Sequence, residues 1–242
     1  SSGLDVSAMD GNLTVNGDLT LGASGASTLT FTGTEGKGDL VVNGNATIYA
    51  SGTVSGTQGD MKVGGNLTHN GTGGTFNFLE FGGSVTQSIS GSVAGLIVDS
   101  LVVDNSFDDA TPADGDVTFS LPVEITPGGV FNPIDGSVQI SSTFTMKSNG
   151  DGTARIATLA NSAAVSDVTG NITFERYVPS TASTSWLVMG NYVTTSPAMT
   201  VQDWAADFGG SIYVYSHDET TNAANCNACS NGWTYLGTSG SL

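Results

Sequence analysis

The strongest constraint on the fold of this chain is a degenerate repeat of about 20 residues. Its clearest copies are GNLTVNGDLT at residues 11–20, GDLVVNGNAT at 38–47 and GDMKVGGNLT at 59–68. Each copy joins two short alternating strands through a Gly or Asn-Gly corner. A short unit that recurs in this way predicts a solenoid, in which successive turns of the chain stack on one another.

Apolar triplets extend the repeat, with units expected to start at residues 13, 40, 61, 79, 96, 117 and 138. The intervals between these starts vary from 17 to 27 residues. Such variation is expected where corner loops differ in length while the inward-facing strands stay constant. Phe81 falls in line with the inward valines of its neighbours. We therefore expect seven units that share one core.

Two all-β folds are consistent with this pattern. Asn-Gly between alternating apolar residues is a strong β-hairpin signal, so a sandwich of antiparallel hairpins is one alternative. A parallel β-helix uses the same residues at its corners, where we expect glycine or asparagine with positive φ. Recurrence in register favours the β-helix, because coils stacked ~4.8 Å apart require the same residue type at the same place. The prediction is a right-handed parallel β-helix over residues 1–165.

The character of the sequence changes near residue 166. Residues 169–179 alternate cleanly, and all three tryptophans, Trp186, Trp204 and Trp233, follow. Aromatic residues gathered after an aromatic-poor stretch predict a separate module with its own core. We expect a small aromatic-rich β-sandwich-like module over residues 166–242, with strands at 211–215 and 232–236 and a short helical turn at 201–208.

Composition limits the partners of the chain. There are 22 acidic and 5 basic residues, a net charge of −17, yet charged residues make up only 11% of the sequence. Because no cluster of Lys or Arg is present to displace counterions from phosphates, we expect no nucleic-acid partner. No run of about 20 apolar residues occurs, so we expect no membrane insertion. Polar positions filled by Gly, Ser, Thr and Asn favour an extracellular protein.

An acidic segment is a candidate calcium site. Four carboxylates fall within nine residues, at Asp108, Asp109, Asp114 and Asp116. Ca²⁺ prefers six to eight oxygen ligands from carboxylates and carbonyls. The alternative is a solvated acidic loop, since the spacing of an EF-hand is absent.

The two cysteines, Cys226 and Cys229, are separated by two residues. We expect a small disulfide that pins a loop. The alternatives are a redox pair or half of a zinc site. A tetrahedral zinc site needs two further ligands, for which His217 is the nearest candidate.

Catalysis is not expected from the residue inventory. Enzymes of this architecture that cleave acidic polysaccharides need a cation to neutralise the substrate carboxylate and a base to remove the proton. The chain has five scattered cations and two histidines, His69 and His217. A glycosidase needs only two suitably spaced carboxylates, so a carbohydrate-binding or glycan-cleaving β-helix is the alternative.

Several segments of the C-terminal region resemble a known family. They are RYVP at 176–179, WLVMG at 186–190, VQDW at 201–204, YVY at 213–215 and GWT at 232–234. They resemble a module of large, adhesin-like secreted surface proteins of Bacteroidota, which the type IX secretion system exports. The resemblance implies that the module continues past residue 242 and is incomplete here, and it implies no catalytic residue.

These observations predict a secreted structural or adhesive segment of a bacterial cell-surface or filament protein, without enzymatic activity. The solenoid is expected to act as a stiff stalk, and the loops and the aromatic module as display surfaces. Expected partners are other copies or neighbouring domains of the same surface protein, together with glycans or host or prey surfaces. Calcium is the one cofactor that the sequence suggests.

Overall fold

The computed structural model describes residues 2–5, 13–31, 39–56, 60–107, 116–157, 168–177, 214–217 and 233–237. Every named element in these ranges is a β-strand. The chain divides into two compact units, Ser1–Ala182 and Ser183–Leu242. In the described ranges there is no helix that is long and apolar enough to cross a membrane.

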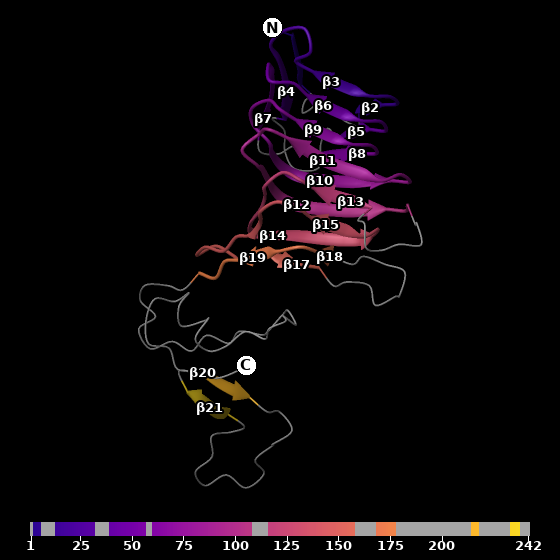
Figure 1. The fold of residues 1–242 in the computed structure, drawn as a ribbon. Coiled ribbons are helices and arrows are strands. Elements are labelled where there is room, and N and C mark those ends of the chain that lie inside the picture. The colour runs from indigo at the N-terminus through magenta and orange to yellow at the C-terminus, as the bar shows by residue number, and fades with distance from the viewer. Residues whose placement is uncertain are drawn as a thin grey trace. The chain divides into compact units, whose positions relative to one another are not determined.

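The first unit is a parallel β-solenoid (Figure 1). Each coil of the chain places one strand on each of three faces. In one coil, β5 (Leu40–Val42) lies on the first face, β6 (Ala46–Ile48) on the second and β7 (Gly52–Gly56) on the third. The next coil begins with β8 (Asp60–Val63), which pairs with β5 in parallel register.

The first face is formed by the strands that open successive coils. They are β2 (Leu13–Val15), β5, β8, the second parts of β10 (Thr75–Gly83), β12 (Leu96–Asn105) and β14 (Val123–Asp135), and β17 (Arg155–Ile156).

The second face is a seven-stranded parallel sheet. It contains β3 (Leu19–Leu21), β6, β9 (Leu67–His69), β11 (Gln87–Gly91), β13 (Val117–Phe119), β15 (Val138–Ile140) and β18 (Val168–Thr169).

The third face collects the strands that close each coil. It contains β1 (Ser2–Asp5), β4 (Ser27–Phe31), β7, the first parts of β10, β12 and β14, and then β16 (Phe144–Met146) and β19 (Ile172–Phe174). The strands β10, β12 and β14 are long because they continue from the third face onto the first without interruption.

Parallel pairing confirms the predicted β-helix, and the alternative of antiparallel hairpins is wrong for the described part of this unit. Leu13, Leu40, Met61 and Leu79 share one register, as expected for the first four repeat starts. The register then continues to Leu101.

The last three expected starts are wrong. Leu96 lies on the third face, and Val117 and Val138 lie on the second. Every face uses the same alternation of Leu, Val and Ile, so an apolar triplet does not identify its own face. Where the glycine corner is absent from the sequence, no local signal shows which of the three faces a strand belongs to.

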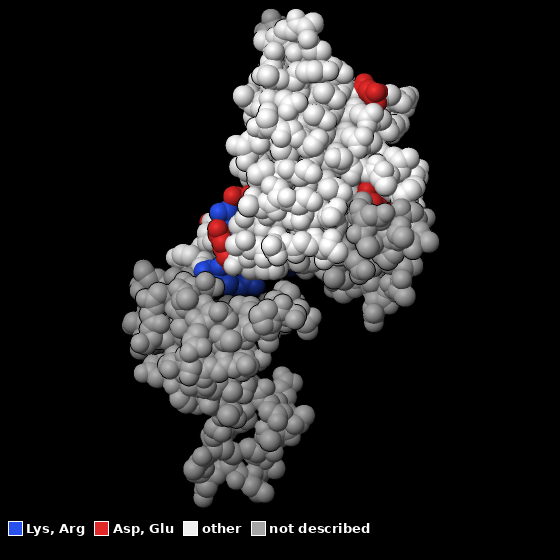
Figure 2. Space-filling model, in the orientation of Figure 1, with Lys and Arg blue, Asp and Glu red and all other residues white. Residues whose placement is uncertain are grey.

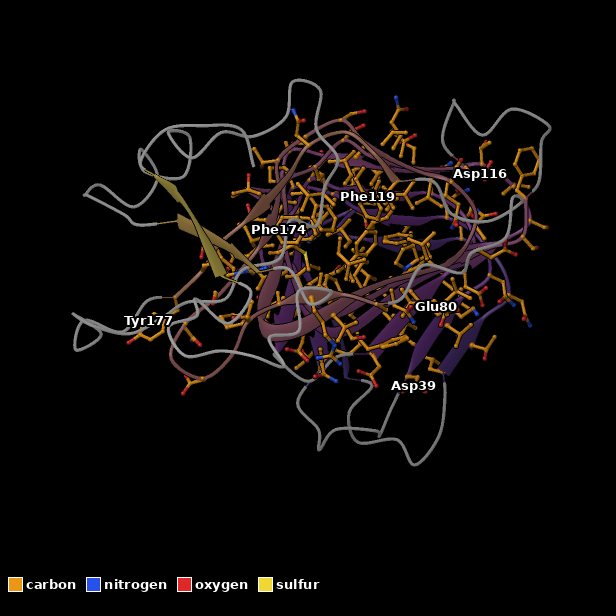
Figure 3. All side chains as sticks on the ribbon, turned by 90° about the horizontal axis from the view of Figure 1, so that it is seen from below. Asp39, Glu80, Asp116, Phe119, Phe174 and Tyr177 are labelled. Carbon is orange, nitrogen blue, oxygen red and sulfur yellow. The ribbon has the colours of Figure 1, made fainter. Side chains whose placement is uncertain are left out.

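The interior is a continuous apolar core. Strands of three residues bury their first and third side chains and turn the middle one outward, as in β5, β6 and β9. Phe119 contacts Phe81 and Phe144 in edge-to-face geometry, with ring centroids 5.6 Å and 6.1 Å apart. Because these rings come from three different faces, they tie the faces together. Seen along the solenoid axis, Phe119 points inward whereas Asp39 and Glu80 lie on the outside (Figure 3).

Glycine at the corner between the first and second faces is required by space. We expected positive φ there, but the φ values of Gly44 and Gly65 lie outside the left-handed region. A Cβ added to Gly44 would lie 2.8 Å from the carbonyl carbon of Gly17, and one added to Gly65 would lie 2.9 Å from that of Gly44. Positive φ does occur at this corner in a later coil, at Gly136 (φ 86°), and it also occurs between the second and third faces, for example at Gly73 (φ 87°).

Residues 168–174 complete the described part of the solenoid, because β18 pairs with β15 and β19 pairs with β16. The two compact units divide after Ala182, later in the chain than the expected boundary at residue 166. In the second unit, β20 (Val214–His217) and β21 (Trp233–Gly237) form an antiparallel pair close to the two expected strands. The helical turn expected at 201–208 lies outside the described residues.

Candidate functional site

The expected calcium ligands are only partly described. Asp108, Asp109 and Asp114 lie outside the described residues. Asp116 is buried, and its Oδ2 accepts hydrogen bonds from the backbone N–H of Ser137 (2.7 Å) and from Ser137 Oγ (3.2 Å). The backbone N–H of Asp116 donates to Ser137 Oγ in return (2.9 Å). This carboxylate joins the coil of β13 to the coil of β15.

Of the expected metal ligands, only Asp116 has a described side chain. Within the described ranges, no group of three or more His, Cys, Asp or Glu side chains is placed to hold a metal ion. Cys226 and Cys229, the expected disulfide, lie outside the described residues. His217 falls in β20, and its side chain is not described.

Polar side chains form a ladder beside the corner glycines. From the sequence, these corners were interpreted only as turns. The Oδ1 atom of Asp18 accepts a hydrogen bond from the backbone N–H of Asn45 (2.7 Å). Asn45 Oδ1 accepts from the N–H of Asn66 (2.9 Å), and Asn66 Oδ1 from the N–H of Ser88 (2.7 Å). Each side chain of this corner ladder (Asp18, Asn45 and Asn66) therefore satisfies a backbone group of the next coil. The recurrence of Asp or Asn after the corner glycine was the available signal.

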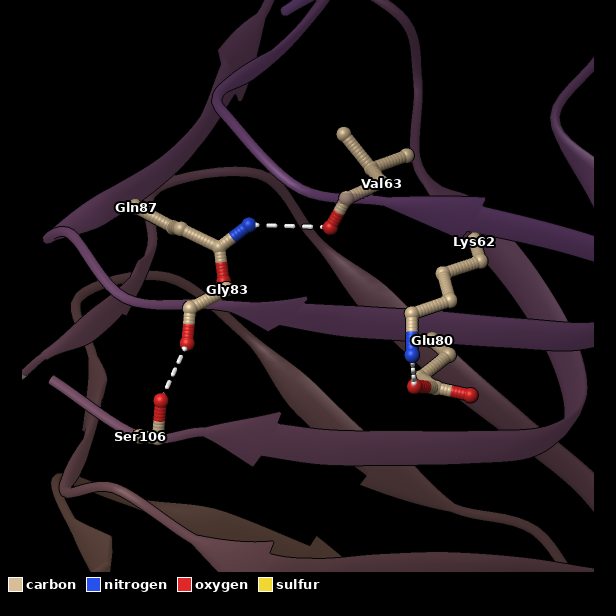
Figure 4. A network of polar contacts seen from close by, with 6 residues as sticks. All are labelled: Lys62, Val63, Glu80, Gly83, Gln87 and Ser106. Carbon is tan, nitrogen blue, oxygen red and sulfur yellow. Dashed lines mark hydrogen bonds and ion pairs between the residues drawn. The ribbon is translucent and has the colours of Figure 1, made fainter. Parts of the chain in front are cut away.

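Two buried amides continue the polar contacts between coils. Gln87 Nε2 donates to the carbonyls of Val63 (3.0 Å) and Gly65 (2.8 Å), and Figure 4 shows the first of these bonds. Asn105 Nδ2 donates to Gln87 Oε1 and to the carbonyl of Val85, both at 2.8 Å. Both side chains are almost fully buried. Their satisfied hydrogen bonds fix the position of each coil on the one before it.

Ion pairs lie on the outside of the first and third faces. Lys62 pairs with Glu80 on the neighbouring strand (Figure 4). Lys147 Nζ lies 2.8 Å from Glu175 Oε1 and 3.4 Å from Glu124 Oε2. The hydrogen bond to Glu175 raises the pKa of Lys147, against a smaller opposing effect of burial and with help from the charge of Glu124. Two ammonium groups therefore face three carboxylates on these two faces.

His69 is buried in the core at a position where the preceding coils carry Ile48 and Leu21. Its Nδ1 accepts a hydrogen bond from the backbone N–H of Gly71 (3.2 Å), which assigns the ring hydrogen to Nε2. That Nε2 atom is buried without a hydrogen-bond partner. Burial lowers the pKa of His69 from 6.5 to about 4. The ring is therefore neutral at pH 7.

This histidine makes stability depend on pH. Above pH 6.5 the ring is neutral in the folded and the unfolded chain, and its contribution to stability is complete. Below that value His69 is protonated in the unfolded chain but stays neutral in the folded chain down to about pH 4. The free energy of unfolding therefore falls as the pH falls through this window. At pH 5 the loss is about 2 kcal/mol. Urea denaturation at pH 7 and pH 5 measures it.

The control for this prediction is His69→Leu, because leucine stands at the equivalent position of β3. We expect the difference in unfolding free energy between the two pH values to be smaller in His69→Leu by about 2 kcal/mol. An unchanged difference would show that His69 does not carry the pH dependence.

Comparison with known proteins leaves the geometry as the basis for a functional assignment. A scan against protein-family models, a search of curated proteins and a search of solved structures each find no match.

Proposed function

We propose that this chain is a structural and adhesive segment of a secreted bacterial cell-surface or filament protein. In this proposal the solenoid is a stiff stalk, and its faces, its loops and an aromatic-rich β-sandwich-like module in the second unit are display surfaces. Its partners are other copies or neighbouring domains of the same surface protein, and its location is extracellular. The sequence resemblance to secreted surface proteins of Bacteroidota supports the same assignment.

The observation that carries the proposal is the continuous register between coils. Backbone pairing on the second face runs from β3 through β6, β9, β11, β13 and β15 to β18. Side chains reinforce it at the corner ladder and at the buried pair Gln87 and Asn105. A hydrogen-bonded ladder parallel to the long axis resists extension along that axis, because many bonds would have to lengthen together. Stiffness of this kind suits a stalk.

The alternative is a carbohydrate-binding or glycan-cleaving β-helix, which would be favoured by a row of outward aromatic side chains. Among the residues whose side chains the structure describes, the exposed aromatic residues are Tyr49 and Tyr177. Tyr49 follows β6 and Tyr177 follows β19, so the two belong to coils that are well separated along the chain. The stalk is therefore the function that we propose.

Negative-stain electron microscopy of the native material, with its intact mass, tests this function. We expect extended rods or fibres, and a native mass above the 24.4 kDa of this chain. An antibody raised against this segment should label the rods at a regular position. A compact particle of about 24 kDa that self-associates with nothing would contradict the proposal.

A further inference from the structure

The second face carries an ordered array of short polar side chains. Its outward positions form two columns along the solenoid. The first column contains Thr20, Thr47, Thr68 and Ser90, continued through the backbone ladder by Ser120 and Ser141. The second contains the corner ladder followed by Ser88, Thr118 and Gln139. We call these two columns the hydroxyl face.

The hydroxyl face has a regular spacing in two directions. Neighbouring strands lie ~4.8 Å apart, and the two outward residues of one strand lie roughly 6.6 Å apart. From β3 to β15 the array is about 25 Å long. The paired registers between these strands are continuous, whereas the pairing of β12 with β14 contains register shifts. The spacing of the hydroxyl face is therefore not interrupted by a register shift between these strands.

Charge is almost excluded from this face. The chain carries a net charge of −17, and the first and third faces bear Lys62, Glu80, Glu124 and Lys147. On the hydroxyl face the one charged residue is Asp18, which is the first residue of the second column and therefore lies at the margin of the face. In Figure 2 the central part of the described surface over β6, β9, β11 and β13 shows no charged side chains, and acidic atoms appear at its right-hand edge. This neutrality is complementary to an uncharged partner.

The array is also rigid before it binds anything. Threonine is branched at Cβ, which restricts its χ1 angle. Asn45 and Asn66 are held by hydrogen bonds to the next coil, through which their Oδ1 atoms are fixed. A partner therefore immobilises few additional rotamers when it docks. Rigidity and regular spacing favour a partner that is itself periodic and rigid.

We propose that the hydroxyl face binds ice. Ice presents neutral oxygen atoms at fixed intervals, and one of its lattice repeats is close to the distance between strands of a sheet. Threonine supplies a hydroxyl that bonds to these oxygen atoms and a methyl group that excludes liquid water. A crystalline polysaccharide is also neutral and periodic, but the described outward positions of this face form no row of aromatic side chains to stack on successive sugar rings, and the exposed aromatic residue beside them is Tyr49, directly after β6. The inference specifies the partner of the adhesive function and rests on that proposal.

Ice-affinity capture of the full chain tests this inference. The protein is held in solution while ice grows slowly on a cold surface, and the protein in the ice fraction is measured. The test variant is Thr68→Lys in β9, and the matched control is Thr145→Lys in β16. Each threonine is the half-buried middle residue of a three-residue strand with buried neighbours, and they lie on the second and third faces respectively. Circular dichroism verifies that both variants fold.

We expect the wild type and Thr145→Lys to be captured equally, and Thr68→Lys to lose capture by about tenfold because a long charged side chain separates the array from ice. Thr68→Val, which keeps the shape and removes the hydroxyl, should lose less. Exclusion of the wild type from ice, or equal losses for the two lysine variants, would overturn the inference. Binding to crystalline cellulose or chitin without ice would also overturn it. Rods seen by electron microscopy would still support the stalk in those cases.

Discussion

Replacement of Phe119 by alanine is expected to lower the free energy of unfolding of the solenoid by about 4 kcal/mol. The side chain is fully buried, and its ring contacts Phe81 on the first face and Phe144 on the third. Its loss removes apolar burial and two edge-to-face contacts, and it leaves a cavity at the point where the three faces meet. Guanidinium denaturation followed by far-UV circular dichroism measures the loss.

Tyr49→Ala is the matched control, because Tyr49 is an aromatic residue of similar size that is 46% exposed. We expect it to change the unfolding free energy by less than about 1 kcal/mol. Similar losses for Phe119→Ala and Tyr49→Ala would show that the contact of the three rings does not stabilise the core.

Replacement of Gly73 by alanine is expected to destabilise the solenoid by about 4 kcal/mol or to prevent folding. Gly73 has a φ of 87°, and an added Cβ would lie 1.7 Å from the carbonyl oxygen of Val54. That oxygen belongs to the backbone of β7, so it cannot turn aside as a flexible side chain would. The coils would have to separate at this corner, which breaks the backbone ladder on the third face.

Substitution of Gly128 is the control that separates the steric clash of an added Cβ from the cost of a left-handed backbone conformation. Its φ is 86°, almost the value of Gly73, but nothing lies within 4 Å of an added Cβ. Gly128→Ala is therefore expected to lose only the cost of a left-handed residue, about 1 kcal/mol. Thermal denaturation of both variants gives the comparison. If the two substitutions cost the same, close packing between coils at Gly73 makes no contribution.

Much of the solenoid could be predicted from particular residues. The alternation in Leu40–Val42 and Leu67–His69 follows from a period of two, and it places His69 inward as surely as Leu21 and Ile48. Phe81 also falls on the inward side, between Val63 and Val103. The sequence could not predict how burial changes the properties of an inward side chain. The lowered pKa of His69 depends on the apolar coils around it.

The contacts of the candidate site residues could be predicted from the sequence less well than the strands. Asp116 was expected to bind calcium together with Asp108, Asp109 and Asp114, which lie outside the described residues. The described contact of its carboxylate is with Ser137, which is 21 residues away. The roles of Gln87 and Asn105 were not anticipated, because polar residues at inward positions interrupt the apolar pattern. Their hydrogen bonds join residues that are 18 to 24 positions apart in the chain. A local pattern does not contain such pairs.

The sequence by itself determined that this chain forms short strands, that they bury alternate residues, and that glycine corners recur between them. These features depend on nearest neighbours along the chain. Only the tertiary structure decided which strands share a face. That choice assigned Val117 to the second face and Leu96 to the third, and it aligned Thr20, Thr47 and Thr68 in one column. The physical reason is that the register between coils depends on the number of residues in each corner loop, because that number decides which residues pair in the next strand.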